Sequence, residues 1–188
     1  MNALCKLSLL LVIGCLFGAC VSLKTPKRPD LVPLSANGTI GSYPVRFNRT
    51  LTGPSGKDTV VSRSLWSYFK SYPGSDSVEL AKATHITLSL TDSHHATAVL
   101  HQKEIPLKTA VVIGRIKKGY FRRKHHLTMS GVPPFYWAMS SDKMQFGIGN
   151  QGQLYIDQAD ETNGSILIIA AGTPGFTTSL TIPSYNKR

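Results

Sequence analysis

The chain has 188 residues, with 21 Lys and Arg against 10 Asp and Glu, and its formal net charge is +11. This length suits a single domain, and a hydrophobic fraction of 41% excludes a chain too polar to fold. Three cysteines are too few for a disulfide scaffold. These figures exclude a large multidomain enzyme, a disordered chain and a disulfide-stapled domain, and they leave a small, basic, folded protein.

The first 19 residues have the three-part layout of a secretory signal. Lys6 precedes an apolar run over residues 7–17, and the small residues Gly18 and Ala19 follow that run. A membrane-spanning helix needs about 20 apolar residues, and this run has roughly half that length. We therefore expect residues 1–19 to be a signal peptide that is removed, and not a membrane span.

The cysteines lie only at positions 5, 15 and 20, so cleavage before Cys20 would leave a single cysteine at the new N-terminus. Residues 16–20, Leu-Phe-Gly-Ala-Cys, resemble the lipobox of bacterial lipoprotein precursors, although Phe17 stands where that family prefers an aliphatic residue. The resemblance implies a diacylglyceryl group on the Cys20 sulfur and an acyl chain such as palmitate on its amino group. It also implies an exported, periplasm-facing protein anchored through Cys20 to the cell membrane or the outer membrane. The alternative is an ordinary cleaved signal peptide with a chance cysteine.

Residues 20–36 are predicted to form a lipid-anchored flexible tether. They contain three prolines and no apolar periodicity. Polyproline II rises about 3.1 Å per residue, so this stretch would hold the domain up to about 50 Å from the lipid. Lys24, Lys27 and Arg28 are expected either to contact anionic headgroups or to be solvated linker charges.

Residues 37–188 are predicted to form one β-rich domain, because short apolar segments alternate with turn residues. One helix is expected near residues 61–72, where Val61, Leu65 and Phe69 lie on one apolar stripe. The fold class is therefore mainly β, an antiparallel meander that closes into a partial barrel or a folded sheet, with one short packed helix. The expected strands are residues 39–51, 84–91, 96–101, 108–116, 120–129, 143–148, 153–157, 165–170 and 177–182.

A basic hairpin is the clearest candidate for a binding site. Eight Lys or Arg residues lie between positions 103 and 126, with one acid among them. Adjacent residues of a strand point to opposite faces, so this hairpin is not buried along its whole length. We expect it either to bind anionic envelope material, such as lipid headgroups or polysaccharide, or to be a solvated hairpin whose charges protect a sheet edge. An exported location makes nucleic acid an unexpected partner. The candidate anionic-ligand residues are Lys117, Lys118, Arg122, Arg123 and Lys124.

Four other motifs give weaker signals. Two pairs of adjacent histidines lie at residues 94–95 and 125–126. Each pair would supply at most one imidazole to a metal, so no metal site is expected. The G-x-G-x-x-G string at residues 147–152 leads into a strand, so we interpret its last three residues, 150–152, as a hairpin turn and expect no cofactor. The aromatic run at 134–137 is expected to plug one end of the domain, with a partner contact as the alternative. Asp157 and the acids after it are expected to solubilise a loop.

No nucleophile motif or catalytic carboxylate pair is recognisable in the sequence, and no enzyme activity is assigned. The body resembles uncharacterised small lipoproteins of Bacteroidetes in its Gly-Tyr-Phe hairpin at 119–121 and its Gly-Asn-Gln-Gly turn at 149–152. The expected function is that of a membrane-anchored envelope lipoprotein with a non-enzymatic binding or structural role. The alternative is a small envelope hydrolase with an unidentified active site, which a histidine within reach of a serine or carboxylate in a cleft would favour.

Overall fold

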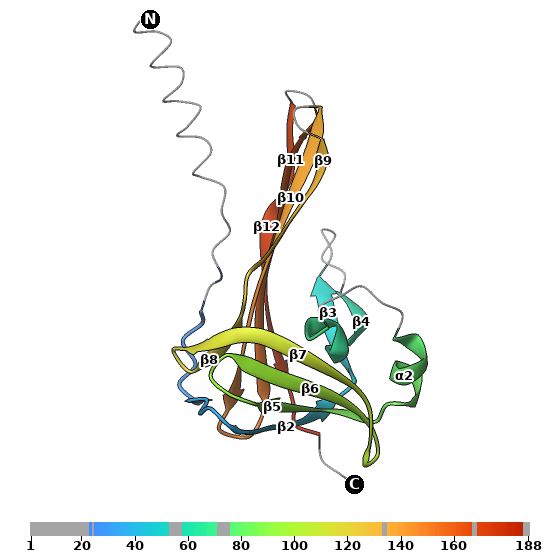
Figure 1. Cartoon of the computed structure of the whole chain (residues 1–188), viewed down its shortest axis with the longest axis vertical. Coiled ribbons are helices and arrows are strands. Elements are labelled where there is room, and N and C mark those ends of the chain that lie inside the picture. Colours follow the sequence, from blue (N-terminus) through green and yellow to red (C-terminus); the bar gives the residue numbers. More distant parts are fainter. Residues whose placement is uncertain are drawn as a thin grey trace, which may run out of the picture. The chain divides into compact units, whose positions relative to one another are not determined.

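A computed structural model of the chain describes residues 23, 25–52, 58–70, 76–132, 135–166 and 169–185. The elements are mainly antiparallel strands with short helical segments, which confirms the predicted fold class (Figure 1). The strands are β1 (Leu31–Val32), β2 (Gly38–Pro44), β3 (Arg46–Thr52), β4 (Asp58–Ser64), β5 (His85–Leu90), β6 (His95–Gln102), β7 (Ile105–Lys117), β8 (Tyr120–Arg123), β9 (His126–Val132), β10 (Tyr136–Gly149), β11 (Leu154–Ile166) and β12 (Ile169–Ile182). The helical segments are the 3₁₀ helix η1 (Leu65–Tyr68) and the α-helix α2 (Ser77–Lys82).

The chain forms two compact units. Unit 1 comprises Met1–Thr25, His125–Lys143 and Gln158–Thr178, and unit 2 comprises Pro26–Lys124, Met144–Asp157 and Ser179–Arg188. The division falls within β10, β11 and β12, each of which contributes residues to both units.

Unit 2 contains the predicted meander. Strands β5, β6, β7 and β8 pair in sequence order, and β2 pairs with β5 at one end of that series. At the other end, β8 pairs with β10, and the sheet continues through β11 to β12. Two hydrogen bonds connect β2 with the far part of the sheet. The Tyr185 amide, just after β12, donates to the Ser42 carbonyl at 2.7 Å, and the Tyr43 hydroxyl donates to the carbonyl of Gly152, in the β10–β11 turn, at 3.2 Å. The sheet of unit 2 therefore curls into the expected partial barrel.

The hydrophobic core of unit 2 follows from the period-two alternation of its strands. In β5, for example, Ile86, Leu88 and Leu90 are all buried, while the residues between them are more exposed. The Phe146 ring lies 5.2 Å from that of Phe121 and 5.7 Å from that of Phe69, measured between ring centroids. The core thus includes Phe69, which follows β4, packed against residues of the sheet strands.

The helix expected near residues 61–72 is wrong in its first half. Val61 lies in β4 and pairs with Arg49 of β3, and the helical turn begins only at Leu65. The apolar spacing reflects real burial, because Leu65 and Phe69 are both in the core. The short α-helix α2, which is separated from β4 by 12 residues, was not predicted.

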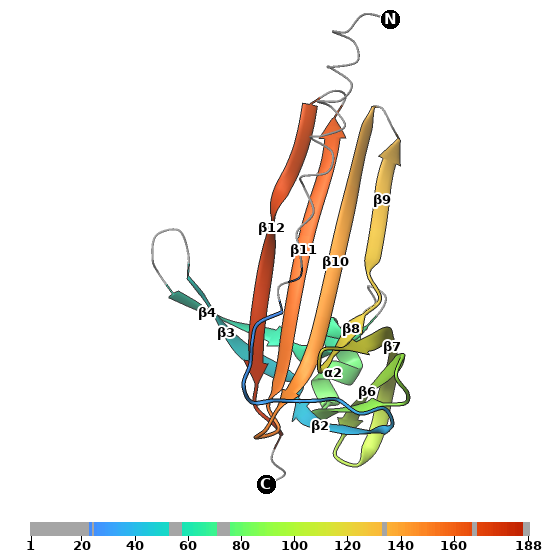
Figure 2. The same cartoon turned by 90° about the vertical axis from the view of Figure 1, so that its left-hand side faces the viewer.

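Unit 1 contains β9 and the adjoining parts of β10, β11 and β12, which run side by side in Figure 2. Among the described residues, the hydrophobic core cluster draws none of its members from unit 1. Several of its large apolar side chains are exposed, including Met129 at 70% and Phe135 at 63%. The prediction that the aromatic run plugs a domain end is therefore wrong for Phe135 and Tyr136, which lie on the surface.

Within the part of the chain that the structure describes, neither helix has the length and hydrophobicity that crossing a membrane would require.

Candidate functional site

Part of the predicted tether lies against the sheet of unit 2. Residues 26–32, called the strap below, include β1, in which Leu31 and Val32 pair with Gly149 and Ile148 of β10. The Asn150 amide also donates a hydrogen bond to the Asp30 carbonyl at 2.9 Å. Backbone pairing thus holds this segment against β10.

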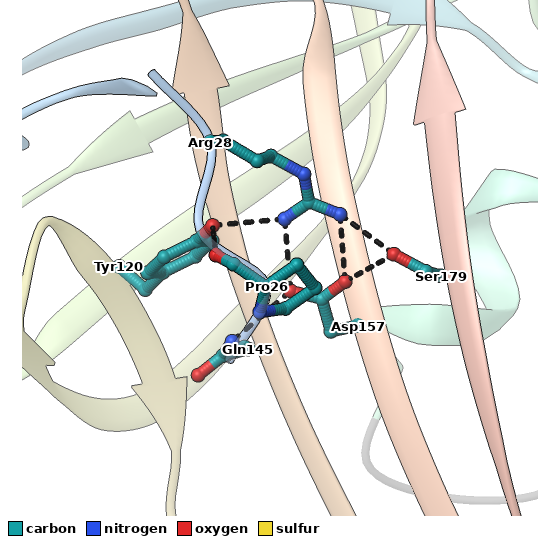
Figure 3. Close-up of polar contacts among 6 residues, drawn as sticks. All are labelled: Pro26, Arg28, Tyr120, Gln145, Asp157 and Ser179. Carbon is teal, nitrogen blue, oxygen red and sulfur yellow. Dashed lines mark hydrogen bonds and ion pairs between the residues drawn. The ribbon is translucent and has the colours of Figure 1, made fainter. Parts of the chain in front are cut away.

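The strap covers a polar face of the sheet that strand alternation creates. In β11, Leu154 and Ile156 are fully buried in the core. Tyr155 and Asp157, which alternate with them, therefore point to the opposite face of the sheet. In β10, Gln145 alternates in the same way with core residues. We call this set the Arg28 site; its members are Arg28 of the strap, Tyr120 of β8, Gln145 of β10, Tyr155 and Asp157 of β11, and Ser179 of β12. Figure 3 shows all of them except Tyr155.

Arg28 binds this face with both terminal nitrogens of its guanidinium group. Nη1 and Nη2 donate to the two carboxylate oxygens of Asp157 at 3.0 and 2.8 Å, a bidentate pair. Nη2 also donates to Ser179 Oγ at 2.6 Å, and Nη1 to the Tyr120 hydroxyl at 2.9 Å. The guanidinium carbon lies 4.1 Å from the centroid of the Tyr155 ring, at cation–π distance. The Arg28 side chain is therefore largely buried, with 12% of its surface exposed.

Asp157 is oriented for this contact by two further donors. Gln145 Nε2 donates to Oδ2 at 3.0 Å, and Ser179 Oγ donates to Oδ1 at 2.6 Å. Burial alone would raise the pKa of Asp157, but the hydrogen bonds from Arg28, Gln145 and Ser179 and the Arg28 charge together lower it. The carboxylate is therefore ionised at neutral pH although its side chain is only 4% exposed.

Asp30 makes a second polar contact between the strap and the sheet. Its Oδ2 accepts hydrogen bonds from Gln153 Nε2 at 2.7 Å and from the Tyr155 hydroxyl at 2.5 Å. The bond to Asp30 raises the pKa of the Tyr155 phenol. Tyr155 thus links the Asp30 contact to the Arg28 site, because its ring also lies under the guanidinium.

The turn between β7 and β8 lies beside the strap. This basic turn comprises Lys117, Lys118 and Gly119, and both Lys118 and Gly119 have positive φ angles, +53° and +80°. A Cβ on Gly119 would come within 2.9 Å of Leu31 Cδ2, so the two segments are in close contact. The Tyr120 hydroxyl, directly after the turn, also donates to the Pro26 carbonyl at 3.3 Å.

The predicted ligand-binding residues divide into two groups. Lys117, Lys118 and Lys124 are exposed, whereas Arg122 and Arg123 are half-buried. Arg123 Nη1 donates to the Tyr68 carbonyl at 3.1 Å, so this side chain has a packing role. Cys20, the predicted lipidation site, lies outside the described residues.

Lys108, which the sequence also places in the basic stretch, pairs with Asp76. The hydrogen bonds from Lys108 and Trp66 lower the pKa of Asp76. This pairing reduces the free positive charge of the hairpin at the end away from the basic turn.

The histidines do not assemble into a hydrolase-type relay at the β5–β6 turn. Asp92 contacts His95 at 2.8 Å, while Ser93 contacts the other imidazole, that of His94, at 2.8 Å. The His95 and Asp92 side chains are 45% and 48% exposed. His125 lies 2.8 Å from Ser141 in unit 1, again on the surface. Among the described residues, no group of three or more His, Cys, Asp and Glu has the arrangement of a metal site.

Residues 150–152 of the glycine string lie in a hairpin turn, as predicted. β10 ends at Gly149, the Gly152 amide donates to the Gly149 carbonyl, and β11 begins at Leu154. A strand, not a helix, follows the string, which excludes the dinucleotide-binding interpretation.

Sequence reasoning missed the Arg28 site itself. The expectation that Asp157 solubilises a loop is wrong, because this residue lies within β11 and is buried. Asp157 lies two positions after Tyr155, on the face of β11 that Leu154 and Ile156 do not occupy. Aspartate is uncommon within strands, so its position there was a usable signal for a polar contact on that face. Arg28 gave no comparable signal, since its surroundings in the sequence are proline-rich and aperiodic.

Comparisons with protein-family models, with curated proteins and with solved structures found no match for this chain.

Proposed function

We propose that the protein is a lipid-anchored, non-enzymatic component of the bacterial envelope whose basic turn contacts anionic lipid headgroups. The position of the strap beside the basic turn carries this proposal, because Leu31 lies against Gly119 and Pro26 is bonded to Tyr120. A chain extends at most about 3.5 Å per residue, and Pro26 lies six positions after Cys20, so the segment between them spans at most about 21 Å. An anchor on Cys20 would keep the basic turn close to the bilayer.

The charges at this end of unit 2 support the same orientation. Lys117 and Lys118 are exposed, and Lys27 of the strap, which lies between the two residues that contact Tyr120, is exposed as well. Each basic residue close to an anionic leaflet contributes about 1 kcal/mol of attraction, which falls off within a Debye length of about 8 Å. Attraction of this kind is too weak to anchor a protein alone, so it orients a body that acyl chains hold at the surface.

Lipidation is tested by metabolic labelling with palmitate. The wild-type chain should incorporate the label, and Cys20→Ser should not, because the acceptor sulfur is missing. Equal labelling of both chains would contradict an anchor at this residue.

Headgroup contact is tested with the chain from Cys20 onward, produced without lipid, on phosphatidylglycerol-containing vesicles. Binding should weaken with added salt and should fall in Lys117→Glu/Lys118→Glu. The matched control is Lys82→Glu/Lys103→Glu, which changes the net charge equally at two other exposed positions and should bind nearly as the wild type does. Equal losses in the two double variants would contradict a specific role for the basic turn, and preferential binding to an anionic polysaccharide would replace the lipid by that ligand.

A further inference from the structure

The β9–β10 turn of unit 1 carries an exposed apolar surface that the proposed function does not use. Val132 ends β9, Phe135 lies in the turn and Tyr136 begins β10, and each of these residues is more than half exposed. We infer that these residues, called the apolar tip below, insert into the interface between the headgroups and the acyl chains of a lipid bilayer. This inference goes beyond the proposed function, because it requires neither Cys20 nor the basic turn.

Backbone hydrogen bonds hold the apolar tip together. The Phe135 amide donates to the Val132 carbonyl at 3.0 Å, across the turn. Val132 and Tyr136 are directly opposite each other in the β9–β10 pairing, so their side chains lie side by side on one face of the hairpin. Figure 2 shows this part of β9 and β10 at one end of the strands of unit 1. The hairpin thus presents the apolar tip to its surroundings instead of burying it.

The opposite face of the same hairpin is apolar as well. Met129 of β9 pairs with Met139 of β10, and Leu127 and Trp137 alternate onto the same side. Leu127 and Met129 are both more than half exposed. An antiparallel sheet at a protein surface usually has one apolar face against the core and one polar face in water. Exposed apolar side chains on both faces suit surroundings that are apolar on every side, such as those between lipids, better than a protein partner that covers one face.

The distribution of charge favours the same partner. Positions 127–141 contain no Lys, Arg, His, Asp or Glu, although 16% of the chain is charged. A charged side chain in this stretch would oppose entry into a bilayer. The aromatic residues 135–137 are of the types that prefer the interface between headgroups and acyl chains. Because no charge takes part, binding by the apolar tip should need no anionic lipid and should be insensitive to salt.

The test uses the fluorescence of Trp137, which directly follows the apolar tip. The chain from Cys20 onward, produced without lipid, is titrated with phosphatidylcholine vesicles whose acyl chains carry bromine, a quencher that acts at short range. The emission of the wild type should be quenched to the same extent in low and high salt. Trp137→Phe should show no quenching, because Trp66 is buried in the core of unit 2.

Phe135→Thr/Tyr136→Thr should raise the lipid concentration at half-maximal quenching by at least about tenfold, because two aromatic side chains no longer leave water. The matched control is Val111→Thr/Ile113→Thr, which replaces two exposed apolar residues of β7 and should titrate as the wild type does. Because all the substituted positions are exposed, both double variants should keep the fold, and circular dichroism checks this.

A wild type that phosphatidylcholine does not quench, or equal titrations of the two double variants, would overturn the inference. Self-association of the wild type that Phe135→Thr/Tyr136→Thr abolishes, with Trp137 unquenched by lipid, would overturn it equally and would make a second copy of the chain the partner. The basic turn is read separately, because Lys117→Glu/Lys118→Glu should leave the quenching by uncharged phosphatidylcholine unchanged. Failure of the basic turn to bind phosphatidylglycerol would therefore overturn the headgroup contact and not the insertion of the apolar tip.

Discussion

The Arg28–Asp157 pair sits at the junction of the strap and the sheet, with side chains 12% and 4% exposed. Breaking a buried ion pair by removing one partner typically costs about 3–5 kcal/mol, because the remaining charge is left without compensation. The three donors to Asp157 are all uncharged or permanently cationic near neutral pH, so the pair is controlled by protonation of the carboxylate alone.

The pair predicts a specific pH dependence of stability. The folded pKa of Asp157 is lowered below the unfolded value of about 3.9, so its contribution is complete above about pH 4 and is lost as the pH falls further. Asp157→Asn should lower the free energy of unfolding by about 3 kcal/mol at pH 7, and the difference from wild type should shrink below pH 4. Denaturant titrations at several pH values measure this difference.

Two comparisons make that measurement specific to Asp157. Asp76, whose pKa Lys108 and Trp66 also lower, is present in both proteins, so the comparison isolates Asp157. Asp58→Asn, at an exposed position of β4, changes the net charge by the same amount and serves as the charge-matched comparison. A difference between Asp157→Asn and wild type that stays constant from pH 7 to pH 3 would show that the carboxylate charge does not support the fold.

At the scale of elements, the β7–β8 hairpin and the strap depend on each other through the basic turn. Gly119 has a φ of +80°, a conformation that costs a residue with a Cβ about 1 kcal/mol or more. An added Cβ would also press on Leu31 at 2.9 Å, and Leu31 pairs with β10. The turn therefore requires glycine both for its own backbone and for the approach of β1.

Gly119→Ala should accordingly lower the free energy of unfolding by about 1–3 kcal/mol and increase amide exchange in β1. Gly38→Ala is a suitable control, because a Cβ at Gly38 meets nothing within 4 Å. If Gly119→Ala exchanges at Leu31 as slowly as the wild type, the turn does not support the strap.

Sequence patterns predicted the strands that pair with the next strand in the chain. They did not predict all the contacts between residues that are far apart in the sequence. Ile86, Leu88 and Leu90 alternate, and β5 pairs with the strand that follows it, so local periodicity was sufficient. The i, i+4 spacing of Leu65 and Phe69 fits a helix, and the pairing of Val61 with Arg49 that makes β4 a strand has no local signature.

The same distinction applies to the candidate site. The basic turn was predictable because its charges are consecutive in sequence, whereas Arg28 and Asp157 are 129 residues apart and meet only after the sheet has formed. Local composition alone therefore made Arg28 a linker charge, and the folded sheet makes it a buried anchor of the strap.

At the scale of the whole molecule, the stability of the chain should come chiefly from unit 2, which contains every described member of the hydrophobic core cluster. Phe146→Ala removes a fully buried ring from this cluster and should lower the free energy of unfolding by about 3–5 kcal/mol. Met129→Ala removes a side chain of unit 1 that is 70% exposed and should change it by less than about 0.5 kcal/mol. Chemical denaturation followed by near-ultraviolet circular dichroism compares the two, and a large loss in Met129→Ala would show that unit 1 contributes a core of its own.

The proposed contact between the basic turn and a membrane predicts a defined orientation of unit 2. The strap lies next to the β7–β8 turn that contains Lys117. Lys103 lies in the turn between β6 and β7, at the opposite end of the 13-residue strand β7. A strand of that length extends about 43 Å, so the two lysines lie at very different distances from the strap.

The most direct test of this orientation is the accessibility of spin labels to a nickel chelate carried on lipid headgroups, measured with the lipidated protein on phosphatidylglycerol-containing vesicles. A label at Lys117→Cys should be relaxed strongly by the headgroup nickel, and one at Lys103→Cys weakly, because only the first lies at the end of β7 that the strap contacts. Equal relaxation at both positions, or stronger relaxation at position 103, would contradict a body held with its basic turn against the membrane.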